Sequence, residues 1–226
     1  MTGQGFVDDL YEKYYSELEG PVIAARKSLA ELDPQSPAFV ALMQRQARRE
    51  LRHAIAFTKA LLKYPELDHH ERAEVAEQAA DEYKHHALIK DYLRSRGADV
   101  EDVSVDAYDA YFDQFLSGDL EAFRLCNIAE KSAVIFMAHL RDVSTDPEVK
   151  TLAARIIEDE EGHEDHIKAK LAKIADDESK RTFLEKQFVQ SWASQKEGVF
   201  LEAREFGIDL EKILANFRRL GGTLSR

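Results

Sequence analysis

Apolar residues recur every three to four positions along most of the chain, which is the period of an amphipathic helix. The first such stretch covers residues 6–32, where Pro21 predicts either a kink or a fresh start of the helix. The segment 33–37 contains two prolines and predicts a break. Ser36 is expected to cap the next helix, 37–63, with Pro37 at its first position.

The same period predicts further helices toward the C-terminus. One covers residues 69–96 and is expected to stop at Gly97, a residue that suits a helix C-terminus. A short aromatic helix is predicted over 105–116, a long one over 119–143, and another over 146–175. Thr145 stands three residues before Glu148, which predicts a capping box at the start of 146–175. One or two more helices are expected over 178–220.

Acidic residues interrupt the apolar stripes of the four long helices between 37 and 175. Each of these helices carries one glutamate near the middle of its stripe, namely Glu50, Glu82, Glu130 and Glu160. A histidine follows three residues after the second and the fourth of them, at His85 and His163, on the same helical face. The helices therefore form two similar halves, each with a glutamate followed by a Glu-x-x-His pair.

Four carboxylates at one level of an apolar core would be too costly unless they were protonated or neutralised by cations. Two divalent metal ions would balance the four charges, and each histidine would supply a neutral nitrogen ligand. Mixed carboxylate and imidazole ligands suit iron or manganese. The alternative is that these acids are solvated charges; for Glu50 the neighbouring Arg48, Arg49 and Arg52 offer ion-pair partners.

This pattern resembles the ferritin-like di-iron carboxylate superfamily, over residues 37–175. The resemblance implies an all-α fold, a ferritin-like antiparallel four-helix bundle with additional N- and C-terminal helices. The chain would be a single helical domain, 1–226, with accessory helices at 6–32, 105–116 and 178–220. The implied cofactor is a pair of iron ions, with manganese as the alternative, and the implied ligands are Glu50, Glu82, His85, Glu130, Glu160 and His163.

Other residues near these positions are candidates for an additional ligand or for support of a ligand, namely His53, Asp81, Asp159, His166 and Cys126. His53 makes a third Glu-x-x-His pair with Glu50. Asp81 and Asp159 each stand four residues before a predicted histidine ligand, so each is expected to orient that imidazole through its other nitrogen. Cys126 would face the same cavity, or would be a small buried filler.

The charge and the cysteine content limit the classes of function. The net charge of −12 disfavours a nucleic-acid-binding protein, because phosphate binding needs clustered basic residues. A single cysteine excludes an intrachain disulfide and a rubredoxin-type Cys-x-x-Cys site. Neither a signal peptide nor a membrane-spanning run is recognisable, so we expect a cytoplasmic protein.

The resemblance implies that the di-iron site reacts with O₂. We expect an oxygenase or oxidase that acts on a small, partly apolar organic substrate, because Phe- and Tyr-rich helices at both ends would build an apolar pocket. Electrons would come from a separate reductase or ferredoxin, and the assembly would be a homodimer. One alternative is ferritin- or rubrerythrin-like iron oxidation or peroxide reduction. Another is a non-catalytic helical interaction protein.

Overall fold

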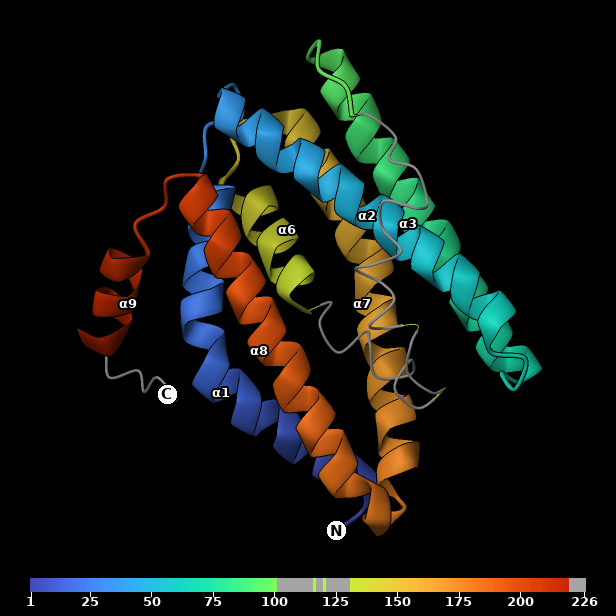
Figure 1. Ribbon diagram of the computed structural model, residues 1–226. Helices are drawn as coiled ribbons and strands as arrows, with labels where there is room; N and C mark the ends of the chain where they lie inside the picture. Colours follow the sequence, from blue (N-terminus) through green and yellow to red (C-terminus); the bar gives the residue numbers. More distant parts are fainter. Residues whose placement is uncertain (101–115, 117–119, 121–130, 220–226) are drawn as a thin grey trace.

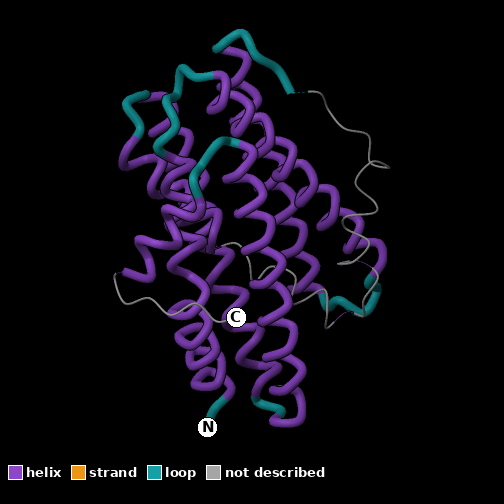
Figure 2. Tube along the Cα trace, turned by 60° about the vertical axis from the view of Figure 1, so that its left-hand side comes forward, coloured by secondary structure: helices purple, strands orange, loops and turns teal. Residues whose placement is uncertain are grey.

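The computed structural model describes residues 1–100, 116, 120 and 131–219, and every element in this part is helical (Figure 2). The elements are α1 (Gly3–Ala30), α2 (Pro37–Lys63), α3 (His69–Ser95), α6 (Lys131–Val143), α7 (Pro147–Ala175), the short 3₁₀ helix η1 (Glu178–Lys180), α8 (Arg181–Glu205) and α9 (Leu210–Arg219). The prediction of an all-α protein is confirmed for these residues. None of the described helices combines the length and apolar composition needed to cross a membrane.

The ends of α2 and α3 follow from local capping chemistry. The hydroxyl of Ser36 accepts a hydrogen bond from the backbone N–H of Phe39 at 3.1 Å, and Pro37 occupies the first turn of α2, as predicted. After α3, Gly97 adopts a φ of 71°, a conformation that favours glycine. The N–H of Ala98 then bonds to the carbonyl of Leu93 at 2.9 Å and closes the helix end.

Two predictions about helix starts differ from the structure. Pro21 lies inside one helix, α1, so it does not start a second helix. Asp146, and not Thr145, caps α7: its side chain accepts a hydrogen bond from the N–H of Glu148 at 2.9 Å. The aspartate directly precedes Pro147, the first helical residue, so it stands in the capping position. The predicted helix 105–116, apart from Leu116, and residues 119 and 121–130 of the predicted helix 119–143 lie outside the described residues.

The helices pack mainly as antiparallel neighbours (Figure 1). α2 and α3 form one hairpin, and α6 and α7 form a second. α3 runs antiparallel to α7: Arg96, after α3, pairs with Asp146, before α7, whereas Glu74 early in α3 pairs with Lys170 late in α7. The middles of α2, α3 and α7 therefore come to one level, which is where the predicted acids lie.

The terminal helices α1 and α8 pack against each other in parallel. Lys13 pairs with Glu185 at 2.9 Å near one end, and Arg26 pairs with Glu202 at 2.8 Å near the other. Gly3 lets the start of α1 approach α7 closely, because a Cβ atom there would stand 2.0 Å from the carbonyl oxygen of Ala172. α1 is thereby fixed to both α7 and α8.

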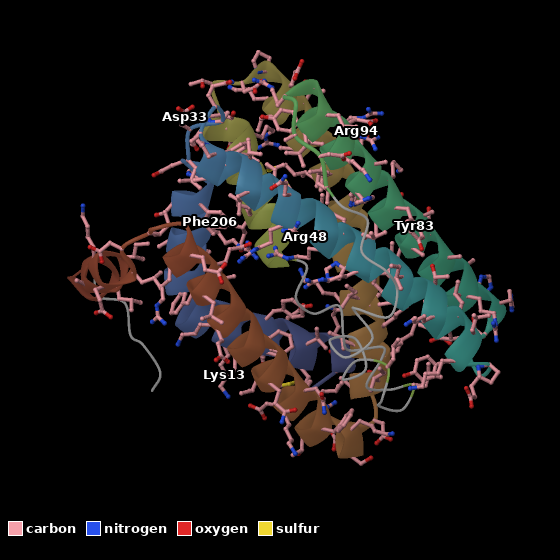
Figure 3. The ribbon with its side chains drawn as sticks, turned by 45° about the horizontal axis from the view of Figure 1, so that its top comes forward. Lys13, Asp33, Arg48, Tyr83, Arg94 and Phe206 are labelled. Atoms are coloured by element: carbon pink, nitrogen blue, oxygen red, sulfur yellow. The ribbon has the colours of Figure 1, made fainter. Side chains whose placement is uncertain are left out.

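The end of α8 lies beside α2 (Figure 3). There the guanidinium of Arg45 lies 5.5 Å from the ring centroid of Phe206 and also pairs with Glu205. The largest buried apolar cluster lies close by and joins α1, α2, α3, α6 and α7. Its fully buried members include Leu29, Phe39, Met43, Leu93, Phe136, Met137 and Leu140.

Candidate metal centre

Four of the six predicted ligands meet in the interior, and they come from three helices. Glu50 comes from α2, Glu82 and His85 from α3, and Glu160 from α7. Each is at most 4% exposed. One potential ligand atom from each lies within 4.8 Å of the others. Metal–ligand bonds of about 2.0–2.2 Å place ligands of one ion up to roughly 4.4 Å apart, so a small contraction would enclose a metal ion.

Helical geometry explains why these side chains converge. Glu82 and His85 are three residues apart on α3, so both project from the same face of that helix. Glu50 lies on the face of α2 that also buries Met43, Ala47 and Ala54. Because α2 and α7 both pack against α3, these faces meet between the three helices.

The imidazole of His85 has two different environments. Its Nδ1 atom lies 3.5 Å from Oε1 of Glu160 and 3.9 Å from Oε2 of both Glu50 and Glu82. Within the described part of the chain, this atom has no hydrogen-bond partner, and neither has Oε2 of Glu82. Buried polar atoms normally have hydrogen-bond partners. Two buried atoms that face carboxylates and have no such partner are therefore suited to bind a metal ion.

The other nitrogen of His85 is held from α7. Nε2 lies 3.2 Å from Oδ2 of Asp159, and the ammonium of Lys84 lies 3.1 Å from the same oxygen. Lys84 also pairs with Asp81 at 2.8 Å. A carboxylate on Nε2 turns Nδ1 toward the three glutamates, as metal-binding histidines require. Asp159 therefore supports the imidazole of His85 on the neighbouring helix; the side chain of His163, the expected partner on its own helix, lies outside the described part.

The buried acids and the imidazole of His85 shift one another's pKa values. Burial raises the pKa of Glu82 well above its usual range, and the negative charge of Glu50 raises it further. Burial alone would lower the pKa of His85, but the carboxylates of Glu50, Glu82 and Glu160 outweigh it and raise the pKa to about 11. Without a metal ion, the cluster therefore holds protons, which a cation would replace.

The remaining predicted residues have different positions. Nδ1 of the half-buried His53 lies 3.4 Å from Oε1 of Glu82, at the edge of the cluster. Glu130 and Cys126 lie outside the described residues. His163 and His166 lie on α7, but their side chains are outside the described part.

A hydrogen-bonded chain that the sequence reasoning did not identify adjoins Glu50. The buried amide of Gln46 donates to Oε1 of Glu50. Arg49 donates to Oε1 of Gln46 and to Oε1 of Glu202, both at 3.0 Å. Arg49 thus pairs with α8 and not, as the ion-pair alternative expected, with Glu50. Only Gln46 gave a local signal, as a polar residue one turn before Glu50 within the apolar stripe.

The far end of this chain contains a buried ion pair. Arg26 is 5% exposed and Glu202 is 2% exposed. Burial and the nearby Arg49 lower the pKa of Arg26 to about 10. Burial would raise the pKa of Glu202, but the guanidinium groups of Arg49 and Arg26 hold it below its usual range. Arg26 and Arg49 therefore both stabilise the ionised carboxylate.

An open groove with a volume of about 430 Å³ runs between α3 and α7, beyond the cluster. Its lining comes from these two helices. The lining residues are Leu88, Asp91, Tyr92, Ser95, Pro147, Glu148, Thr151, Leu152 and Arg155.

No family model matches this chain, and comparisons with curated proteins and with solved structures find no match either. The assignment of a function therefore depends on the site itself. The buried cluster of Glu50, Glu82, His85 and Glu160 could hold a metal ion, and its donor set alone does not distinguish iron from manganese.

Proposed function

We propose that this chain is a non-heme di-iron oxidoreductase, which activates O₂ to oxygenate or oxidise a small organic substrate. The observation that carries the proposal is the convergence of three carboxylates and one imidazole, all buried, from three helices. A protein gains nothing in stability by burying such a group without a counter-ion, because each charge loses its hydration. A metal-binding role accounts for the cost.

The second half of the proposed site is Glu130 and His163. Glu130 directly precedes α6 in the sequence, and His163 follows Glu160 by three residues on α7. With them, the ligands become four carboxylates and two imidazoles, which suit two iron ions or two manganese ions. The ferritin-like four-helix bundle belongs to the same proposal: α2, α3 and α7 would be three of its helices, and the predicted helix 119–143 the fourth.

The residues of the chain would have different roles in the site. Glu50, Glu82, His85 and Glu160 would hold the ions, and Asp159 would keep the imidazole of His85 in its ligating orientation. The surrounding helices exclude water from the cluster, since none of these four residues is more than 4% exposed. Bound iron would supply the redox chemistry with O₂, and a separate reductase or ferredoxin would supply electrons.

The deciding experiment is metal reconstitution. The metal-free protein is loaded with Fe²⁺ under anaerobic conditions, and bound iron is measured by elemental analysis. We expect two irons per chain, and O₂ consumption when the loaded protein is exposed to air. Glu130→Ala should abolish the two-iron stoichiometry, whereas Glu158→Ala, a change at an exposed acid on α7, should keep it.

Three outcomes would contradict the proposal in different ways. Two irons in Glu130→Ala would show that the ligand set is wrong. No iron in the unaltered protein, with no loss of stability after chelation, would favour the non-catalytic helical interaction protein. A large cage-like assembly, measured by light scattering, would favour iron storage instead of oxygenation.

A further inference from the structure

We propose that Gln46 and Arg49 are positioning residues, which hold Glu50 as a ligand that offers one oxygen, and that Glu202 anchors them from α8. This inference rests on the proposed function, because the orientation of Glu50 matters only if the cluster binds metal. It extends the site beyond the predicted four-helix core to a terminal helix.

The orientation of Gln46 follows from its two neighbours. A guanidinium can only donate, so Arg49 requires the carbonyl oxygen of the Gln46 amide on its side. The NH₂ group of Gln46 must then point to the other side, where it donates to Oε1 of Glu50. A donor fixed in this way favours the ionised form of the carboxylate, which is the form that binds metal.

Arg49 is itself held at two points. One of its terminal nitrogens bonds to Gln46 and the other to Oε1 of Glu202, each at 3.0 Å. The second oxygen of Glu202 is taken by Arg26 at 2.8 Å. Glu202 therefore bridges two arginines from two other helices. Both oxygens of the buried Glu202 are thus paired, which restricts its carboxylate to one geometry.

The consequence for Glu50 is an asymmetry between its two oxygens. Oε1 is occupied by the amide of Gln46, whereas Oε2 lies 3.9 Å from Nδ1 of His85 and faces the cluster. Glu50 can thus present Oε2 to a metal ion without rotating away from Gln46.

The competing explanation is that the network merely fastens α8 to α2. The chain contains a matched control for that explanation. Arg45 and Glu205 also join α2 to α8, about one turn away from Arg49 and Glu202, but no described contact links them to Glu50. Their side chains are 37% and 54% exposed. If helix fastening alone mattered, each variant would weaken metal binding only in proportion to the stability that it removes.

The test uses Co²⁺ as a spectroscopic probe with the full-length protein. Metal-free wild type, Gln46→Met, Glu202→Gln and Glu205→Gln are titrated with Co²⁺, and the affinity and visible absorption bands are recorded. We expect about 10- to 100-fold weaker binding in Gln46→Met, with altered bands, as for other residues that support a metal ligand. Glu202→Gln should shift both readouts in the same direction, whereas Glu205→Gln should match wild type.

Each of the other possible results would contradict a specific part of the proposal. If Gln46→Met and Glu202→Gln bind Co²⁺ like wild type with unchanged bands, the positioning role is wrong and the proposed function stands. If Glu205→Gln weakens binding as much as Glu202→Gln, the network only fastens helices. If wild type binds no Co²⁺, both the inference and the proposed function fail. Should circular dichroism show that Gln46→Met does not fold, Glu202→Gln decides.

Discussion

Nε2 of His85 on α3 lies 3.2 Å from Oδ2 of Asp159 on α7. This contact crosses between two helices and leaves Nδ1 of the same imidazole facing three carboxylates. The two nitrogens therefore have different roles: Nε2 contacts Asp159, and Nδ1 is directed to the candidate metal position.

Replacing Asp159 by asparagine should weaken metal binding. The amide loses the negative charge that makes His85 a stronger ligand, so we expect a decrease in affinity of about 10- to 100-fold. Isothermal titration calorimetry with Fe²⁺ or Mn²⁺ measures this change. The adjacent, exposed Glu158 provides the control, and Glu158→Gln should bind as wild type does. Equal affinities for Asp159→Asn and wild type would exclude the supporting role.

Glu82→Gln should separate metal binding from stability. The pKa of Glu82 is raised by burial and by Glu50, so in the metal-free protein its carboxyl group keeps a proton to higher pH than an exposed glutamate does, and a neutral amide resembles that protonated form. We expect the free energy of unfolding without metal to stay within about 1 kcal/mol of wild type, or to rise. Metal binding should be lost.

Urea unfolding in the presence of a chelator and metal titration together check this prediction. Glu77→Gln, a change at an exposed residue of α3, is the control and should alter neither property. A large loss of metal-free stability in Glu82→Gln would mean that the carboxyl group has a structural role.

Much of the site could be predicted because helical periodicity reports which residues face inward. Glu50, Glu82, His85 and Glu160 each interrupt an apolar stripe, and a charged group inside such a stripe needs a partner. Periodicity also located α2 and α3 closely, since Ser36, Pro37 and Gly97 carry clear start and stop signals.

The remaining contacts depend on how one helix is aligned with another, and periodicity does not encode that alignment. Asp159 was expected to serve His163 because only contacts within a helix can be counted from sequence. In the structure it contacts His85, which is 74 residues away in the sequence. Glu202 and Arg26 are 176 residues apart, and neither sits in a motif. Their pairing depends on the parallel packing of α1 and α8.

Metal-free stability should fall as the pH rises from 7 to 9. The folded state raises the pKa of His85 from 6.5 to about 11, so it binds this proton more tightly than the unfolded chain does. The resulting stabilisation is complete below pH 6.5 and is lost as the pH rises toward 11. The raised pKa of Glu82 acts in the same direction.

The slope cannot exceed about 1.4 kcal/mol per pH unit for each proton that only the folded state retains. Urea midpoints at pH 7, 8 and 9 with a chelator measure it, and His85→Gln should flatten the dependence. Saturating metal should also flatten it, because the ion replaces the proton. Stability that is constant or increases over this range in the metal-free protein would contradict the electrostatic description of the cluster.

Asp146→Ala should destabilise the junction of α3 and α7. Asp146 caps α7 through the N–H of Glu148, pairs with Arg96 and accepts a hydrogen bond from the hydroxyl of Tyr92 at 3.4 Å. Loss of a cap costs about 0.5–2 kcal/mol, and the hydroxyl of the buried Tyr92 and the half-buried guanidinium of Arg96 would also lose a partner. We expect the free energy of unfolding to fall by at least about 2 kcal/mol in urea denaturation.

Asp146→Asn separates the two contributions, because asparagine caps a helix about as well as aspartate but cannot pair with Arg96 as an anion. Its free energy of unfolding should therefore lie between those of wild type and Asp146→Ala. Asp142→Ala is the matched control: this side chain is 61% exposed and pairs with Arg141, so the change should leave the free energy of unfolding close to that of wild type. If Asp146→Asn is as unstable as Asp146→Ala, the loss comes from the ion pair with Arg96, and the cap of α7 contributes little.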